Sequence, residues 1–254
     1  MHPNFPRFIL ALQLTLGLAF STLAGATDVI VSAAASLTNA FTEIGKEYET
    51  AHPGDRVQFN FGASGSLLQQ IARGAPVDVF AAADQETMDR AEKRNLLVKG
   101  TREDFASNRL VVVVPKDSSV TFRDLTDLSS DAIRRIALGI PDSVPAGRYA
   151  KGALEAAKLW EALQPKYVYT QNVRQSLDYV MRGETDAGFV YATDAELVKG
   201  KVRTALEVPT ATPIRYPIAA VKGNGQEMHA RKFVTFIQSE AAQRILLKYG
   251  FGKP

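Results

Sequence analysis

Hydrophobic positions along the chain change repeatedly between two patterns. Short continuous or alternating apolar runs, typical of strands, precede runs whose apolar residues recur every three or four positions, typical of helices. The first strand is predicted over Val29–Ala35, and Leu37, Phe41, Ile44 and Tyr48 then share one face of a helix. The same succession recurs to the end of the chain. It predicts an α/β protein with mixed, largely parallel sheets.

The later strands and helices follow from the same two patterns. Further strands are predicted over residues 56–61, 77–84, 109–116, 134–140, 166–170, 186–191 and 215–223. Further helices are predicted over residues 67–74, 84–94, 148–160, 173–183 and 239–250, with one more centred on 231–237. Asp84 and Ser239 are predicted to cap the starts of two helices, while Gly74 and Gly250 are predicted to end two.

The first 26 residues have the pattern of an export signal. Arg7 precedes an acid-free apolar run, FILALQLTLGLAF, and a small-x-small pattern, Ala24-Gly25-Ala26, follows it. This arrangement predicts a secretory signal peptide, residues 1–26, cut at that pattern. A retained membrane anchor is the alternative, but the apolar run is short for a span and lacks a stop-transfer flank.

Two lobes are predicted for the remaining 228 or so residues, a length that suits one large or two smaller domains. The strand around Asn108 marks the boundary between the halves. The closing helices need a sheet to cover, so the last part of the chain is expected to return to the first half. The prediction is lobe I from residues 27–107 plus 217–254, lobe II from 108–216, and a cleft between them.

Composition narrows the location and the partners. The chain has no cysteine, which excludes disulfides and a lipid-modified cysteine, so the mature protein is expected to be soluble in a Gram-negative periplasm. The formal net charge is +3, with Lys and Arg scattered among acids. That distribution argues against nucleic acid as a partner and is compatible with weak attraction for anions.

Common catalytic and nucleotide-binding motifs are missing. His2, His52 and His229 are the only histidines, and none has a partner at metal-ligand spacing. No Gly-x-Ser-x-Gly elbow, Walker loop or Gly-x-Gly-x-x-Gly fingerprint occurs. We therefore expect no direct metal ligands and no catalytic residues.

Small or hydroxyl residues recur where a predicted strand gives way to a helix. Ser36, Ser64, Ala146 and Val173 stand at four such junctions, and Tyr191 ends a strand at a fifth. Helix N-termini offer free N–H groups and partial positive charge, and ligands of open α/β sheets bind beyond the strand ends. Simple helix capping is the alternative at each junction. Together, the junctions predict an anion-binding cleft without specifying the anion.

The sequence resembles one known family over nearly all of the mature chain. It is similar to the periplasmic molybdate-binding proteins of bacterial molybdate ABC transporters, which are type II periplasmic substrate-binding proteins. The most specific matches are Ala34–Thr38, Gly74–Asp84 and Val144–Gly147. The other matching stretches are AAASLTNAF at 33–41, FNFGASGSLLQQIARG at 59–74, LVVVVPK at 110–116, VRQSLDYVMRGETDAGFVYATDA at 173–195, YPIAAV at 216–221 and YGF at 249–251.

The resemblance implies a fold, a ligand and a set of contacts. The fold would be two α/β lobes closing on a tetrahedral oxyanion, molybdate or tungstate, for delivery to a membrane permease. By motif, Ser36 and Ser64 would supply hydroxyl and N–H groups, Ala146 and Val173 backbone N–H groups, and Tyr191 its hydroxyl. The family also implies a monomer that is not an enzyme and holds no cofactor.

Such a site would consist of hydrogen-bond donors, which has consequences for specificity. A buried dianion would be held by fixed dipoles in place of a counter-ion. Donors would favour a fully ionised ligand, because a protonated oxyanion would turn a hydrogen towards another hydrogen. Cavity size would then separate molybdate from the smaller sulfate, while tungstate, of nearly the same size as molybdate, should bind as well.

Several alternatives stay open. Ser66 competes with Ser64, although the position relative to Leu67 favours Ser64. Arg148 and Arg174 either steer the anion or point to solvent from the first turn of a helix.

Two other functions also stay open. The same fold could bind another oxyanion, such as sulfate, thiosulfate or phosphate. A hydrolase with Ser36 or Ser64 as nucleophile is the rival of a different class, and the absence of a well-placed histidine argues against it.

Overall fold

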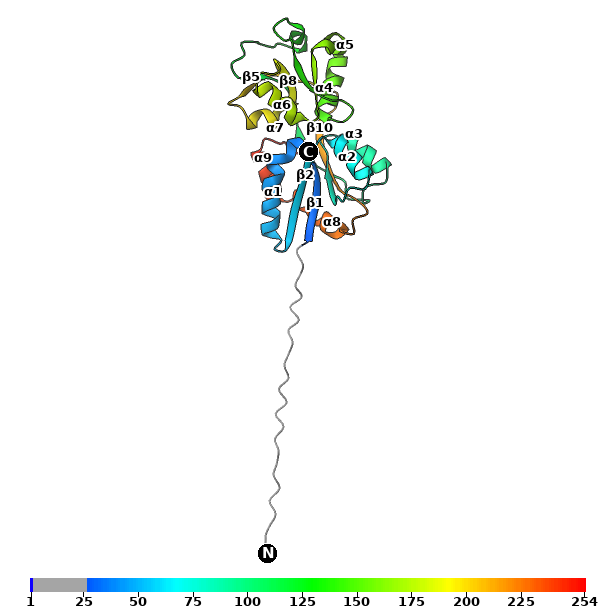
Figure 1. Cartoon of the computed structure of the whole chain (residues 1–254). Helices are drawn as coiled ribbons and strands as arrows, with labels where there is room; N and C mark the ends of the chain where they lie inside the picture. Colours follow the sequence, from blue (N-terminus) through cyan, green and yellow to red (C-terminus); the bar gives the residue numbers. More distant parts are fainter. Residues whose placement is uncertain (2–26) are drawn as a thin grey trace.

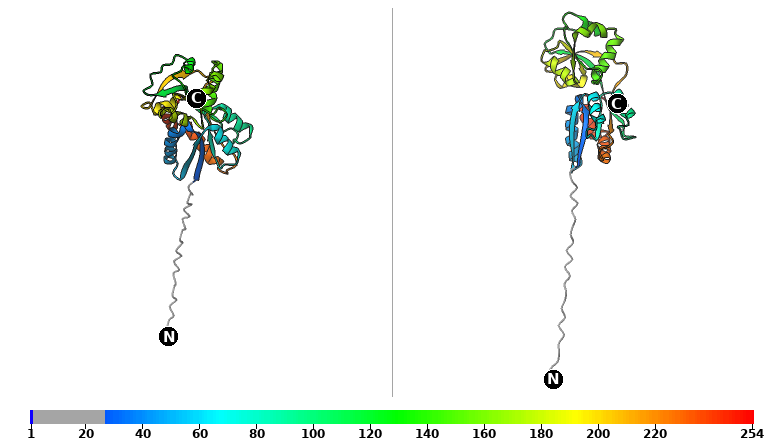
Figure 2. Two further views of the ribbon diagram at one scale, coloured as in Figure 1. Left: turned by 45° about the horizontal axis from the view of Figure 1, so that its top comes forward. Right: turned by 45° about the vertical axis from the view of Figure 1, so that its right-hand side comes forward.

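The computed structural model describes residue 1 and residues 27–254. The predicted signal peptide, apart from Met1, therefore lies outside the described residues. The described chain forms two α/β lobes joined by a narrower waist, and the C-terminus lies near this waist (Figures 1 and 2). None of the described helices is long and apolar enough to cross a membrane.

Lobe I is built on one sheet. Its strands are β1 (Thr27–Ala34), β2 (Asp55–Gly62), β3 (Val79–Ala81), β4 (Glu103–Asn108) and β10 (Ile214–Ala220). They lie in the order β2-β1-β3-β10-β4. The β1 strand is parallel to β2 and β3, whereas β10 runs antiparallel to β3 and β4.

Helices cover the sheet of lobe I. They are η1 (Ala35–Leu37), α1 (Thr38–Ala51), α2 (Ser64–Ala72), α3 (Gln85–Lys93), α8 (Glu227–Ile237) and α9 (Glu240–Lys248). The α1 helix buries Phe41, Ile44 and Tyr48, the face predicted from its periodicity. Helix α9 packs on α1, and α8 packs on β1 and β10, so both C-terminal helices belong to lobe I (Figure 1).

Lobe II repeats this plan around a second sheet. Its strands are β5 (Leu110–Pro115), β6 (Ile136–Gly139), β7 (Tyr167–Thr170), β8 (Ala187–Tyr191) and β9 (Val202–Val208), in the order β7-β6-β8-β5-β9. Its helices are η2 (Leu125–Ser129), α4 (Pro145–Ala156), α5 (Trp160–Leu163), η3 (Gln164–Lys166), α6 (Val173–Met181) and α7 (Ala192–Leu197). The β6 strand is parallel to β7 and β8, and β5 is antiparallel to β8 and β9.

The predicted fold class is confirmed: the protein is α/β, with two mixed sheets. Each sheet has two parallel and two antiparallel strand pairs, so the parallel share is half, smaller than the apolar runs suggested. The physical reason lies in β5 and β10, the strands that follow a passage between lobes. Each joins its sheet without a preceding crossover helix, so it is free to pair antiparallel.

The sequence pattern missed two strands, β4 and β9, and several short helical elements, α5, α7, η2 and η3. The strands β4 and β9 form edges of their sheets, and their sequences, EDFASN and VRTALEV, include exposed polar residues. An edge strand pairs on one side only and need not be apolar. Helix α7 has only six residues, too few to show a helical period.

The chain passes between the lobes at two places. One passage is Arg109, between β4 and β5, and the other is residues 209–213, between β9 and β10. The predicted lobe boundary at Pro217 falls inside β10, whose pairing with β4 begins at Ile214 opposite Asn108. We therefore propose lobe I as residues 27–108 plus 214–254 and lobe II as residues 109–213.

Candidate functional site

A small cavity lies where the two lobes meet. Its volume is about 10 Å³, compared with about 380 Å³ to 500 Å³ for four other pockets. We call it the interlobe cavity. The residues that line it are Ala34, Ala35, Ser36, Gly62, Ala63, Ser64, Ala83, Val144, Pro145, Asn172 and Val173. None of them is charged. The cavity suits a small ligand that interacts with dipoles.

Ser36 reaches the cavity from the end of β1. The strand stops at Ala34, and Ser36 lies in the η1 turn with a side chain only 3% exposed. Neither η1 nor α1 has a side-chain cap, so the alternative that Ser36 is an ordinary N-cap is wrong. Its hydroxyl instead lies 3.0 Å from the hydroxyl of Tyr216 in β10. The Ser36 side chain therefore contacts Tyr216 at the interlobe cavity and does not cap a helix.

Ser64 is the first residue of α2 and is fully buried. The backbone N–H of Ala83 donates to Ser64 Oγ at 3.0 Å. A backbone N–H cannot accept in return, so the proton of the Ser64 hydroxyl is left for another acceptor. Ser66 is partly exposed and does not line the cavity. The geometry favours Ser64 over Ser66.

Two helices of lobe II point their N-termini at the cavity. Helix α4 begins at Pro145, which has no N–H, so Ala146 carries the first amide proton of that helix. Helix α6 begins at Val173, and its N-cap Asn172 accepts from the Gln175 N–H at 3.1 Å. First-turn N–H groups have no partner within their own helix. Val173 lines the cavity, and Ala146 directly follows a residue that does.

Tyr191 stands behind the lining rather than in it. Its ring is 1% exposed, and its hydroxyl donates to the carbonyl of Ala83 across the lobes at 3.4 Å, a long and weak bond. Burial raises the pKa of the Tyr191 hydroxyl well above its ordinary value of 10. The group therefore stays a neutral donor beside a residue that lines the cavity.

Arg148 joins the two lobes. From α4 its Nε donates to Asp84 Oδ2 at 2.9 Å, and its Nη2 donates to Thr87 Oγ1 at 3.2 Å, both in lobe I. Asp84 also caps α3 by accepting from the Thr87 N–H at 3.2 Å, which confirms the predicted N-cap. The alternative that Arg148 points to solvent is wrong, because this pairing holds its head group between the lobes, and steering of the anion stays a prediction.

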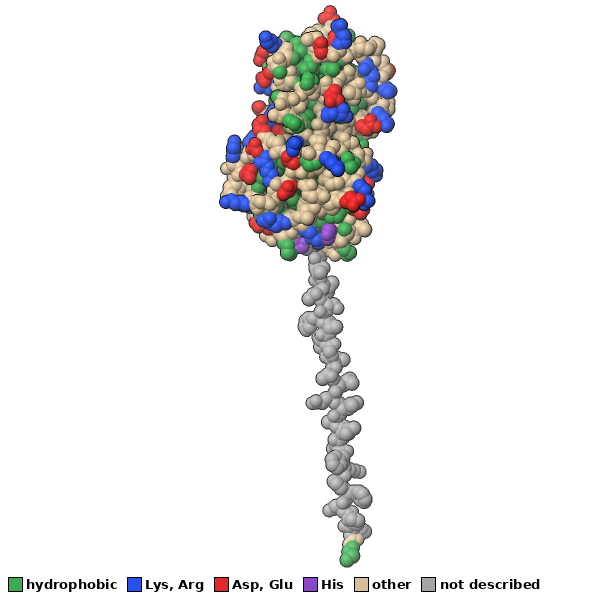
Figure 3. Space-filling view, turned by 180° about the vertical axis from the view of Figure 1, so that it is seen from behind, with side chains coloured by type: hydrophobic (Ala, Val, Ile, Leu, Met, Phe, Trp, Pro, Cys, Tyr) green, Lys and Arg blue, Asp and Glu red, His purple; other side chains and the backbone are tan. Residues whose placement is uncertain are grey.

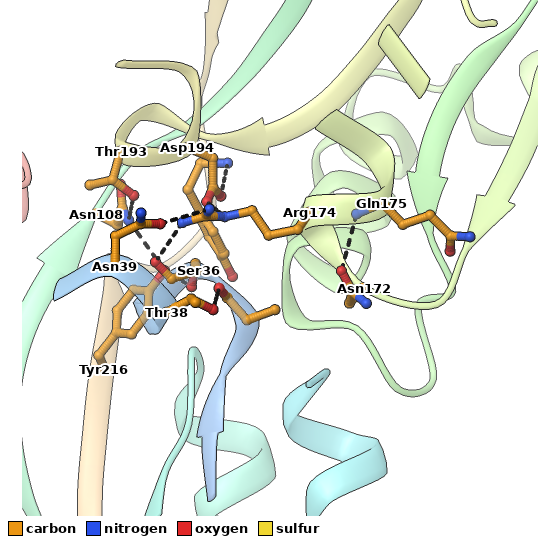
Figure 4. Close-up of polar contacts among 12 residues, drawn as sticks. Ser36, Thr38, Asn39, Asn108, Asn172, Arg174, Gln175, Thr193, Asp194 and Tyr216 are labelled. Atoms are coloured by element: carbon orange, nitrogen blue, oxygen red, sulfur yellow. Dashed lines mark hydrogen bonds and ion pairs between the residues drawn. The ribbon is translucent and has the colours of Figure 1, made fainter. Parts of the chain in front are cut away.

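Arg174 makes a second connection, from the first turn of α6. Its Nη1 donates to Asn39 Oδ1 at 3.0 Å, and its Nη2 donates to the carbonyl of Ser36 at 3.3 Å (Figure 4). Its Nε donates to Asp194 Oδ1 at 2.5 Å. Burial raises the pKa of Asp194, and the charge of Arg174 opposes that rise. Neither expectation for Arg174, steering or solvent, describes these contacts.

The lobes also touch through their backbones. The N–H of Gly65 in α2 donates to the carbonyl of Ser143 in lobe II at 2.9 Å. A Cβ at Gly65 would lie 2.7 Å from Ser143 Cα and 2.8 Å from its oxygen. Only glycine permits this approach.

Comparison with known proteins identifies the family to which the chain belongs. The family described as bacterial extracellular solute-binding protein matches residues 29–252. The molybdate-binding protein ModA of Escherichia coli K12 is 36% identical and covers 94% of this chain and 94% of its own. ModA of Haemophilus influenzae is 35% identical, covering 92% of this chain and 93% of its own. The chain therefore belongs to the bacterial extracellular solute-binding proteins.

Within that family the similarity extends to structure. The periplasmic molybdate-binding protein of Azotobacter vinelandii has a TM-score of 0.79 to this fold, at 22% identity, over 89% of this chain and 99% of its own. At 22% sequence identity, this match supports the fold alone. The resemblance read from the sequence is confirmed, since these two ModA relatives, at 35% and 36% identity over 92% and 94% of the chain, are named molybdate-binding proteins.

Proposed function

We propose that this protein binds molybdate, and tungstate as well, in the periplasm and passes it to the membrane permease of a molybdate ABC transporter. The observation that carries this proposal is the uncharged interlobe cavity, bordered by two serine hydroxyls and two helix N-termini. The two relatives described above, which cover 92% and 94% of the chain, are named molybdate-binding proteins. The proposed ligand contacts are Ser36, Ser64, Ala146 and Val173, together with Tyr191, whose hydroxyl would turn from the Ala83 carbonyl to the ligand.

Fixed dipoles would compensate the charge of the ligand. Hydrogen bonds from neutral groups to a charged one are worth about 1.5–3 kcal/mol each. Several of them can replace a counter-ion for a buried dianion, whose transfer from water would otherwise be very costly. No carboxylate lines the cavity to repel it.

Binding would close the two lobes on the ligand. Ser36 and Ser64 come from lobe I, whereas Ala146 and Val173 come from lobe II, so an anion touching all four holds the lobes together. Arg148, Arg174 and Gly65 add contacts between the lobes around the same point. The closed form would be the shape that the permease recognises.

The same proposal covers partners and chemistry. We propose a monomer without cofactor, direct metal ligand or catalytic activity. The hydroxyls of Ser36 and Ser64 contact Tyr216 and the Ala83 N–H, so neither is paired with a histidine that could activate it. Acidic and basic side chains are interspersed over the face shown in Figure 3. This mixed charge argues against a nucleic-acid partner, which would need a basic surface.

A thermal-shift panel on residues 27–254 tests the proposed ligand. A ligand at about a thousand times its Kd stabilises a protein by ~4 kcal/mol, which is roughly 8–16 °C for a chain of this size. Molybdate and tungstate should give this shift, while sulfate, thiosulfate and phosphate should give little. A larger rise in melting temperature with one of the other anions would show that this anion, and not molybdate, is the ligand.

A further inference from the structure

Tyr216 is a buried tyrosine that sequence analysis did not single out as part of the site. It lies in β10, fully buried, with Phe105, Tyr191 and Phe251 packed around its ring at centroid distances of 6.3, 5.7 and 5.5 Å. These aromatic contacts fix the ring. Its hydroxyl is thereby held 3.0 Å from Ser36 Oγ, in the proposed ligand site.

The direction of the Tyr216–Ser36 hydrogen bond depends on Asn108. The Asn108 side chain accepts from the Arg109 backbone N–H through Oδ1 at 2.9 Å. Because a backbone N–H can only donate, this contact identifies the amide oxygen. The amide nitrogen then donates to Tyr216 Oη at 3.2 Å and to Thr193 Oγ1 at 2.9 Å (Figure 4).

Tyr216 consequently receives one hydrogen bond and has one proton to give. Its partner other than Asn108 is Ser36 Oγ. If Ser36 donated to Tyr216 instead, the fully buried tyrosine proton would have no acceptor, whereas the Ser36 proton can turn to a ligand in the adjoining cavity. The tyrosine therefore donates, and the Ser36 proton remains for a ligand.

The Ser64 hydroxyl also accepts a hydrogen bond from the protein, in this case from a backbone N–H. The Ala83 N–H donates to Ser64 Oγ and cannot accept, so the Ser64 proton also remains for a ligand. Each serine thus receives a hydrogen bond from the protein and turns its own proton elsewhere. The two hydroxyls come from different strand ends, yet both become donors.

We propose that Asn108 and Tyr216 act as positioning residues that turn the Ser36 proton towards the ligand, and so strengthen the preference of the site for oxyanions that carry no proton. This inference rests on the proposed function, in which Ser36 contacts the ligand. In this Asn108–Tyr216–Ser36 relay, the Tyr216 proton occupies one acceptor position of Ser36 Oγ, and the Ser36 proton is directed to the ligand. A protonated oxyanion would then face two donors with a hydrogen of its own.

The test uses a pair of anions of similar size. At neutral pH selenate carries no proton, whereas arsenate carries at least one. Each is titrated calorimetrically, in competition with molybdate, against the wild type and Tyr216→Phe. In the variant, Ser36 is free to accept, so the arsenate-to-selenate affinity ratio should rise about tenfold or more, while the molybdate affinity falls about tenfold.

Three further measurements make the result decisive. Asn108→Ala, which frees the Tyr216 hydroxyl to reverse, should shift the ratio in the same direction by a smaller factor. Tyr249→Phe, which removes a hydroxyl that binds Glu43, should leave it unchanged. Thermal unfolding without ligand checks that each variant folds.

The outcomes separate this inference from the proposed function. A wild type that binds no molybdate would overturn the proposed function. A wild type that binds molybdate, with the same arsenate-to-selenate ratio in Tyr216→Phe and Asn108→Ala, would overturn the relay alone.

Discussion

Single residues at the interlobe cavity combine two properties that rarely coincide. Ser36 and Ser64 are almost fully buried, yet Ser64 keeps a hydroxyl proton that the described residues do not bind, and the proposed donation from Tyr216 leaves Ser36 in the same state. Buried polar groups are normally satisfied within the protein, because an unused donor costs about 1–3 kcal/mol. A buried hydroxyl proton without an acceptor therefore indicates a ligand site, and a bound anion would supply the acceptor.

Removing either serine hydroxyl should weaken binding. Ser36→Ala and Ser64→Ala are each expected to raise the Kd for molybdate by one to two orders of magnitude, about the loss of one charge-assisted hydrogen bond. Isothermal calorimetry measures the effect. Ser66→Ala is the matched control and should bind as the wild type does. Unchanged affinity in both cavity variants would sink the site assignment.

The Tyr191 hydroxyl allows a prediction about pH. Burial raises its pKa, so the neutral form persists above pH 10, where an ordinary tyrosine is half ionised and a phenolate would repel the anion. The ratio of molybdate affinities of the wild type and Tyr191→Phe should therefore stay constant from pH 7.5 to 10. If the wild type alone lost affinity over that range, the hydroxyl would be titrating and the prediction would be wrong.

At the scale of the elements, helix N-termini and close backbone contacts define the cleft. Helices α4 and α6 of lobe II and α2 of lobe I all begin at the interlobe cavity. The start of α2 comes so near to lobe II that Gly65 has no room for a side chain. The same position is free of that neighbour if the lobes move apart.

Gly65→Ala should therefore act on closure rather than on folding. The added Cβ would collide with the Ser143 backbone, so we expect at least a tenfold weaker Kd with unchanged or slightly higher stability without ligand. Gly152→Ala makes the same change in α4, where a Cβ meets open space, and should leave binding intact. Equal affinity of the two variants in calorimetry would contradict the closure argument.

At the scale of the whole molecule, arginines hold the lobes together. Arg148 and Arg174 start from lobe II and reach lobe I, on the two helices whose N-termini face the cavity. Asp84, the partner of Arg148, is 3% exposed. Because these bonds exist only when the lobes meet, they stabilise the closed form and should slow release of the ligand.

Arg148→Met keeps the aliphatic stem of the side chain and removes its bonds to Asp84 and Thr87. We expect molybdate to dissociate about three to ten times faster, the loss of about 0.7–1.4 kcal/mol for a partly exposed pair. Stopped-flow competition with tungstate measures the rate. Arg182→Met, which removes an exposed arginine paired with Glu184 inside lobe II, is the control. Equal rates in the two variants would show that Arg148 does not hold the lobes closed.

The sequence by itself determined the class of fold and the kind of site. Hydrophobic period and strand-to-helix junctions are local features, so the α/β class and the positions of Ser36, Ser64 and Val173 at helix starts could be read from neighbouring residues. Edge strands such as β4 and the short α7 could not, because their local patterns are weak.

Only the tertiary structure decided how those positions work together. Tyr216 lies 180 positions from Ser36, and Arg148 lies 64 positions from Asp84, so no local pattern pairs them. The sequence placed Tyr216 only within a predicted strand, and it left Arg148 with two alternatives, steering the anion or pointing to solvent. Their roles arise from packing one lobe against the other, which brings together groups whose partners are absent from their own segments.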